Sequence, residues 1–140
     1  FVKLLSDRCM KKANEEGVIR TKLGRKCRFE MWEPKDFGIH TPETFENASA
    51  KYGRGNIKRA FTYKALNRLI QGSAADQTKQ AILSCYELGY LPLLQIHDEL
   101  CFNVLKDDVP KIVKAMEDCV KLNVPSVVDV ALGNDFGSAT

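Results

Sequence analysis

The spacing of apolar residues predicts a helix at the start of the chain and a hairpin directly after it. Apolar side chains recur at helical intervals over residues 1–16, and Gly17 is suited to end that helix. Two short runs, 18–21 and 27–29, then flank a basic turn that contains Gly24. Glycine permits a tight turn, so these runs are expected to pair as antiparallel strands.

The middle of the chain changes its pattern twice. Periodicity disappears after residue 30, and prolines and glycines recur, so residues 31–55 are predicted to form a long surface loop. A helical pattern then runs from Asn56 to about Leu88, with a bend expected near Gly72 and Ser73. The side chains expected to be buried along it are Ile57, Phe61, Leu66, Leu69, Ile70, Ala74, Ala81, Ile82 and Cys85.

The last third predicts a second hairpin, a helix and a final strand. Residues 91–96 and 99–105 are apolar-rich and are separated by His97 and Asp98 alone, as in a hairpin with a two-residue connection. Asp107 is expected to cap the next helix, and residues 126–132 to form a strand. The fold class is therefore α+β, a single domain over 1–140 in which an antiparallel sheet is backed by amphipathic helices.

Composition indicates in which compartment this domain is found. No run reaches the roughly 18 apolar residues of a spanning helix, and a signal peptide is not recognisable, so we expect an intracellular protein without a membrane partner. The five cysteines are widely spaced and form no CxxC pair. They predict reduced, mostly buried thiols, and neither a zinc site nor a disulfide framework.

The charge is divided unequally along the chain. Residues 1–80 hold 17 Lys and Arg against 9 Asp and Glu, whereas residues 81–140 hold 4 against 9. Two basic clusters contain no acid: Arg20, Lys22, Arg25, Lys26 and Arg28, and then Lys51, Arg54, Lys58, Arg59 and Lys64. Such clusters suit the phosphates of nucleic acid, although an ordinary solvated surface is the alternative for each cluster taken alone.

The strongest candidate chemistry is in the second hairpin, at His97, Asp98 and Glu99. Adjacent carboxylates repel one another unless a cation or water screens them, and a divalent metal is a natural screen. Carboxylates on a rigid turn are also what two-metal phosphoryl transfer requires. A polar turn without chemistry is the alternative, and a further carboxylate is missing, since Asp129 is more simply explained as a surface residue.

A second candidate site lies on the long helical segment. Tyr63, Asn67 and Gln71 follow at intervals of four, with Lys64 and Arg68 beside them, and form one polar face. Amide groups can bond to acceptors that every base pair displays in the minor groove, so this face could hold duplex DNA without selecting its sequence. A solvated helix face is the alternative.

These motifs together resemble a known family. The run from Ala65 to Asp76 and the run from Gln95 to Leu100 resemble the last two motif regions of family A (polymerase I type) DNA polymerases, including their His-Asp-Glu motif. The turn from Thr21 to Lys26 is similar to a Leu-Asp-Gly-Arg-Arg turn of that family. Further similarity lies in residues 106–109 and 133–136, and the least matched part is 31–55, which is longer than usual.

The resemblance implies roles for individual residues. Asp98 is then a ligand of Mg²⁺, Glu99 a neighbouring catalytic carboxylate near the primer end, and His97 a primer contact. Contacts to primer-template DNA are implied for Asn67, Gln71, Arg68 and Lys64, and for Arg25 and Lys26 at the backbone. Tyr63 stands where the family usually has arginine, which leaves that minor-groove contact open.

The resemblance also implies partners outside this sequence. The first catalytic aspartate of the family and its nucleotide-binding fingers helix do not appear, so a dNTP site and a two-metal site would be completed by further segments, including a thumb. We expect the palm part of a phage-like polymerase of a bacterium or infected host, inactive alone. The alternatives are a non-catalytic nucleic-acid-binding or assembly module and, on His97 and Asp98 alone, a metal phosphohydrolase.

Overall fold

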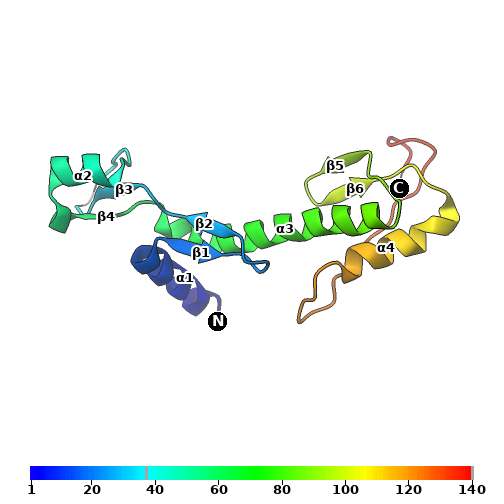
Figure 1. The fold of residues 1–140 in the computed structure, drawn as a ribbon, viewed down its shortest axis with the longest axis horizontal. Coiled ribbons are helices and arrows are strands. Elements are labelled where there is room, and N and C mark those ends of the chain that lie inside the picture. The colour runs from blue at the N-terminus through cyan, green and yellow to red at the C-terminus, as the bar shows by residue number, and fades with distance from the viewer. Residues whose placement is uncertain (37, 140) are drawn as a thin grey trace. The chain divides into compact units, whose positions relative to one another are not determined.

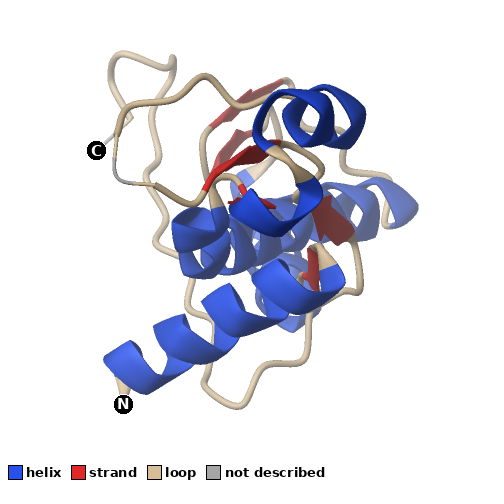
Figure 2. Cartoon of the chain, turned by 90° about the vertical axis from the view of Figure 1, so that its left-hand side faces the viewer, coloured by secondary structure: helices blue, strands red, loops and turns tan. Residues whose placement is uncertain are grey.

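The structure, a computed structural model, describes residues 1–36 and 38–139. Its internal contacts divide the chain into two compact units, unit 1 (Phe1–Ser73) and unit 2 (Ala74–Thr140). Helices make up most of the regular structure (Figures 1 and 2). Every strand among the described residues is three residues long. No helix among the described residues is long and apolar enough to cross a lipid bilayer.

Unit 1 begins with the predicted helix and hairpin. Helix α1 (Val2–Glu16) ends at Gly17, whose φ of 70° is the left-handed conformation that favours glycine at a helix C-cap. Strands β1 (Val18–Arg20) and β2 (Lys26–Arg28) then pair antiparallel, with Ile19 opposite Cys27. The turn between them contains Gly24 at a φ of 89°. Both predicted elements are confirmed.

The prediction of a long loop over 31–55 was wrong. Strand β3 (Trp32–Pro34) pairs antiparallel with β4 (Ile57–Arg59), and helix α2 (Phe45–Tyr52) lies between them in the chain. The Thr44 side chain accepts a hydrogen bond from the Asn47 amide and caps α2. A short 3₁₀ turn, η1 (Arg54–Asn56), joins α2 to β4. The prolines and glycines therefore mark the ends of short elements.

Helix α3 (Ala65–Glu87) begins later than the periodicity predicted, after a second 3₁₀ turn, η2 (Thr62–Lys64). It continues through Gly72 and Ser73 as one helix. Its first residues complete the core of unit 1, where α1, the β1–β2 hairpin and α3 bury Cys9, Ala13, Ile19, Phe29 and Ala65 together. Ile70 is 57% exposed and Ala74 is exposed, contrary to expectation, whereas Ala81 and Cys85 are buried.

In unit 2, strands β5 (Leu94–Ile96) and β6 (Glu99–Cys101) form an antiparallel pair. A 3₁₀ turn, η3 (Lys106–Asp108), leads into α4 (Val109–Asp118), and Asp108, not Asp107, occupies the N-cap position. The strand expected over 126–132 is absent from the described residues, where that segment has no regular structure.

The strands do not form the predicted single sheet. The described strands make three separate two-stranded sheets, β1–β2, β3–β4 and β5–β6. The sequence correctly indicated a mixture of helices and antiparallel strands.

All five cysteines are free thiols, but only Cys9 and Cys85 are buried. Burial raises the pKa of the Cys85 and Cys119 thiols, so neither favours the reactive thiolate.

Candidate functional site

The tip of the β5–β6 hairpin carries the two candidate carboxylates. Ile96 pairs with Glu99, so His97 and Asp98 alone form the connection. His97 adopts a φ of 53°, a left-handed conformation that is uncommon for residues other than glycine. The Gln95 side chain donates to the His97 carbonyl at 3.0 Å, which ties the turn to β5. His97, Asp98 and Glu99 are all exposed.

The carboxylates of Asp98 and Glu99 have no ion-pair or hydrogen-bond partner among the described residues. They are open to ligands, and carboxylate oxygens are the donors that Mg²⁺ prefers, commonly one or two from the protein with the rest from water or phosphate. No group of three or more possible metal ligands occurs within residues 1–36 and 38–139. Asp129 is exposed in a segment without regular structure. The donor chemistry therefore fits Mg²⁺, but as part of a ligand set.

The polar face predicted on the long helix is divided between two elements. Asn67 and Gln71 lie on α3, one turn apart and exposed. Tyr63 precedes the helix, in η2, and is 68% exposed. The Lys64 ammonium lies 5.1 Å from the centre of the Phe61 ring and 5.5 Å from that of Tyr63. The amides thus share a helix face, while Tyr63 and Lys64 belong to the preceding turn.

The basic β1–β2 turn rests on α3 within unit 1. The Lys22 amide donates to Ser73 Oγ at 2.9 Å, and Arg25 Nη2 donates to the Gly72 carbonyl at 2.9 Å. A Cβ on Gly72 would lie 2.9 Å from Thr21 Cγ2, so the turn requires glycine at this point of the helix. Close packing by the protein itself therefore explains Gly72. Lys26 is exposed on β2.

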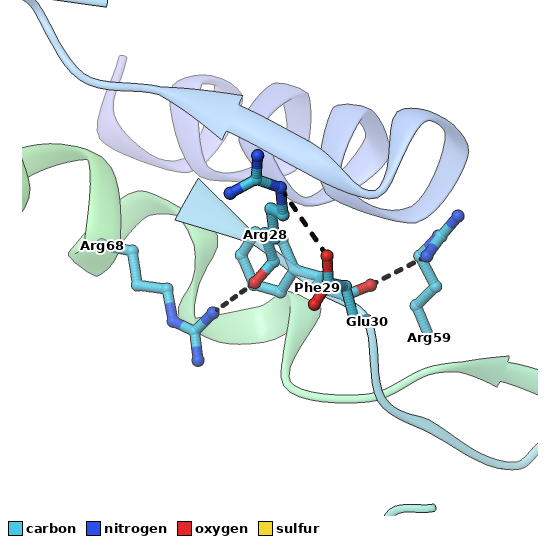
Figure 3. A network of polar contacts seen from close by, with 5 residues as sticks. All are labelled: Arg28, Phe29, Glu30, Arg59 and Arg68. Atoms are coloured by element: carbon cyan, nitrogen blue, oxygen red, sulfur yellow. Dashed lines mark hydrogen bonds and ion pairs between the residues drawn. The ribbon is translucent and has the colours of Figure 1, made fainter. Parts of the chain in front are cut away.

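Two arginines hold the end of β2 (Figure 3). Arg68 from α3 donates to the Arg28 carbonyl at 3.0 Å and lies 4.6 Å from the Phe29 ring centre. Arg59 from β4 donates to the Phe29 carbonyl at 2.8 Å. Arg28 itself lies 3.6 Å from a Glu30 carboxylate oxygen. The guanidinium of Arg68, predicted as a DNA contact, is therefore also part of the fold.

Arg59 also makes a contact that the sequence did not predict. Its guanidinium lies 4.6 Å from the Trp32 ring centre, and a Cβ on Gly17 would fall 2.5 Å from its central carbon. In the sequence analysis, Arg59 is only one member of a basic cluster. The other contact that the sequence did not predict joins Tyr90 to Asp108 across 18 positions. Neither contact has a local signal, because no short-range periodicity links residues so far apart.

Comparison with known proteins gives matches along almost the whole chain. The family model described as DNA polymerase family A matches residues 2–138. A DNA-directed DNA polymerase of Pseudomonas phage M6 is 39% identical over 140 residues, which is 98% of this chain and 18% of that protein. The thermostable DNA polymerase I of Thermus thermophilus is 37% identical over 92 residues, 60% of this chain and 11% of that protein.

A solved structure is similar as well. The POL domain of Pol1 from M. smegmatis, in complex with DNA primer-template and dNTP, matches with a TM-score of 0.58 and 26% sequence identity. The match covers 89% of this chain and 20% of that one. The chain thus spans less than a fifth of the length of the phage and Thermus relatives and a fifth of the solved chain.

Proposed function

Because this chain belongs to DNA polymerase family A, we propose that it supplies one carboxylate pair and a DNA-holding surface for template-directed nucleotidyl transfer. The single observation that carries the proposal is the hairpin tip, where Asp98 and Glu99 are exposed and their carboxylates have no ion-pair or hydrogen-bond partner among the described residues. The family match over residues 2–138 includes this tip. Its place of action would be inside the cell, with primer-template DNA and dNTP as substrates.

In the proposed reaction, the primer 3′-hydroxyl oxygen bonds to the α-phosphorus of a dNTP, and the bond to the β-phosphate oxygen breaks. The hydroxyl proton passes to solvent water, and pyrophosphate leaves. Asp98 would hold Mg²⁺, with the remaining ligands coming from substrate phosphates, water and residues outside this chain. Bound Mg²⁺ supplies polarisation of phosphate oxygens and neutralisation of developing charge. Glu99 would lie beside the primer end, and His97 would contact the primer strand.

The DNA surface of the proposal lies in unit 1. Asn67 and Gln71 are exposed amides one helical turn apart, which suits donation to minor-groove acceptors without sequence selection. The exposed residues Tyr63, Lys64 and Lys26 would add stacking or charge. The guanidinium groups of Arg25 and Arg68 already donate to backbone carbonyls. We propose that these two residues shape the surface as well as adding positive charge to it.

The decisive experiment is Asp98→Ala in a polymerase that carries this segment together with the rest of the family's catalytic parts. Single-turnover extension is expected to fall about 10³-fold, corresponding to roughly 4 kcal/mol of lost charge stabilisation. Primer-template affinity should stay within about twofold, since no phosphate contact is removed. Near-normal extension would show that the tip is only a polar turn.

Two further variants make that result specific. Glu99→Ala should reduce extension less than Asp98→Ala, because Glu99 is proposed to lie beside the metal ligands. Gln71→Ala should weaken primer-template binding yet leave the dependence of extension on Mg²⁺ concentration unchanged, because its proposed role is a minor-groove hydrogen bond. A shifted Mg²⁺ dependence in Gln71→Ala would contradict the assignment of these two roles.

For the isolated chain, a second function competes: nucleic-acid binding without catalysis. The absence of a three-ligand cluster within residues 1–36 and 38–139 favours it. The isolated chain is expected to bind duplex DNA and to incorporate no dNTP at any Mg²⁺ concentration. Extension by a preparation shown to be free of other polymerases would overturn this expectation and would require a further metal ligand within the chain.

A further inference from the structure

The β5–β6 hairpin is closed at its base by a side-chain contact between residues that flank it. The Tyr90 hydroxyl donates to Asp108 Oδ1 at 2.9 Å, and the Lys111 ammonium donates to the same oxygen at 2.8 Å. Tyr90 precedes β5, and Asp108 follows β6 at the start of α4. The contact therefore spans the segment that contains the whole hairpin.

Both ends of this contact are fixed to helices. The Tyr90 amide donates to the Cys85 carbonyl at 2.9 Å, which attaches it to the last turns of α3. Asp108 is the last residue of η3 and the N-cap residue of α4, and its amide donates to the Leu105 carbonyl at 3.0 Å. The Leu93 amide donates to the Cys101 carbonyl at 2.8 Å, which extends the strand pairing toward this base. The hairpin thus emerges from a frame made of α3 and α4.

Asp108 departs from the usual behaviour of an aspartate at its position. Aspartate at an N-cap normally accepts a hydrogen bond from an amide of the first helical turn. Asp108 makes no such cap bond, although it lies at the N-cap of α4. Its carboxylate turns to Tyr90 and Lys111 and is only 25% exposed. The helix N-terminus still favours its negative charge. The Asp108 carboxylate therefore accepts a hydrogen bond from Tyr90, on the other side of the hairpin, and none from an amide of its own helix.

We propose that Tyr90 and Asp108 are positioning residues, which hold the base of the β5–β6 hairpin and thereby fix where its tip presents Asp98. The proposal rests on the proposed function of Asp98. Strands of three residues offer few backbone bonds, so one side-chain closure makes up a large share of what orders the hairpin. The contact between Tyr90 and Asp108 also closes the segment that contains both strands, so less conformational entropy is lost when β5 and β6 then pair. Lys111 supports the contact by keeping Asp108 ionised.

The test on this chain is amide hydrogen exchange measured by NMR. Tyr90→Phe removes one hydroxyl, and protection of the Leu93 amide is expected to fall about fivefold, the usual effect of one hydrogen bond. The Phe29 amide, which donates to the Gly17 carbonyl in unit 1, should keep its protection. Tyr86→Phe is the matched control, because Tyr86 is 63% exposed and its hydroxyl has no hydrogen-bond partner among the described residues. Unchanged Leu93 protection in Tyr90→Phe, or an equal loss at Phe29, would overturn the proposal.

A second measurement separates positioning from stability alone. In a polymerase that carries this segment, Tyr90→Phe and Asp108→Ala should lower the single-turnover extension rate about fivefold and leave primer-template affinity unchanged. Asp108→Glu should recover part of the rate, since it retains a carboxylate acceptor. Reduced Leu93 protection with a normal extension rate would show that the contact is structural only, which overturns the positioning role.

The two proposals can fail separately. If Asp98→Ala extends DNA normally, the proposed function of the tip fails, whatever Tyr90→Phe does to hydrogen exchange. If Asp98→Ala is inactive and Tyr90→Phe has a normal extension rate, the proposed function stands and the positioning role fails.

Discussion

The two units hold their candidate residues in different ways. In unit 1, the basic residues are joined to packed structure: Arg25 donates to Gly72, and Arg68 and Arg59 donate to successive carbonyls at the end of β2. In unit 2, Asp98 and Glu99 stand at a hairpin tip without side-chain partners among the described residues. A surface that spreads positive charge tolerates anchored side chains, whereas carboxylates that bind a metal must remain open.

The charge follows the same division. Unit 1 carries 16 Lys and Arg against 8 Asp and Glu, and unit 2 carries 5 against 10. Unit 1 also has a cluster of buried core residues from α1, the first hairpin and α3. Substitutions in unit 1 should therefore act through packing and DNA affinity, and substitutions at the tip of unit 2 should act on chemistry.

The largest stability effect is expected at Gly17, where the Arg59 guanidinium occupies the space that a Cβ would need. Gly17→Ala places a Cβ on a residue with a φ of 70°, 2.5 Å from the Arg59 guanidinium carbon. Left-handed strain and overpacking together should lower the free energy of unfolding by about 3 kcal/mol. Gly24→Ala is the matched control: its φ is 89°, but nothing lies within 4 Å of the new Cβ, so about 1 kcal/mol is expected. Equal losses in urea unfolding would refute the proposed role of the Arg59 contact.

DNA affinity should depend on unit 1 and on salt. If about three phosphates are neutralised, raising salt from 50 to 200 mM should weaken duplex binding about 40-fold, because counterions are released. Lys22→Glu with Lys26→Glu should reduce both the affinity and this salt dependence. The matched pair in unit 2, Lys114→Glu with Lys121→Glu, should change neither appreciably. Fluorescence anisotropy can measure all three proteins, and equal effects of the two pairs would remove the distinction between the units.

At the tip of unit 2, backbone strain and side-chain chemistry can be separated through His97. His97→Gly relieves the left-handed conformation but frees the unfolded backbone, so stability should change by less than about 1 kcal/mol. If the imidazole contacts the primer, primer-template affinity of the complete polymerase should nevertheless fall. Thermal unfolding and binding measured side by side give the answer. Unchanged affinity would leave His97 with a turn role only.

The smallest expected effect is on the stability of the fold at low pH. Hydrogen bonds from Lys111 and Tyr90 lower the pKa of Asp108 below its usual value. A carboxyl with a lowered folded pKa stabilises the fold above its unfolded pKa, and that contribution is lost as pH falls through the folded value. Between about pH 4 and pH 2, the native chain should therefore lose slightly more stability than Asp108→Asn. Parallel acid-unfolding curves for the two proteins would show that this contact adds no pH dependence.

Local patterns predicted the elements that are locally determined. Helix α1 with its Gly17 cap, and the hairpin β1–β2, follow from periodicity and from turn residues. Helix α2 was missed because it has only eight residues, with Pro42 and Gly53 close to its two ends, and its one buried position, Ala48, gives no recognisable period. A strand was also predicted over 126–132, but no strand among the described residues pairs with this segment.

The residues of the candidate site also differ in whether local sequence could reveal them. His97, Asp98 and Glu99 were found because their chemistry and spacing are contiguous in sequence. Tyr63 was placed on the helix because its spacing fits, but Phe61 adopts a left-handed φ of 62° and the helix begins only at Ala65. The supporting contact of Tyr90 with Asp108 depends on tertiary structure, so periodicity and spacing could not reveal it.

The two-residue connection at His97 and Asp98 also makes the length of this turn a constraint. Successive strand residues face opposite sides, so a one-residue insertion that shifts the pairing moves Glu99 to the side now taken by Leu100. Only a bulge could absorb the extra residue and keep the facing of β6. Substitutions at the tip can preserve its geometry, whereas a single added or deleted residue that no bulge absorbs reverses the facing of every side chain of β6, including the Glu99 carboxylate.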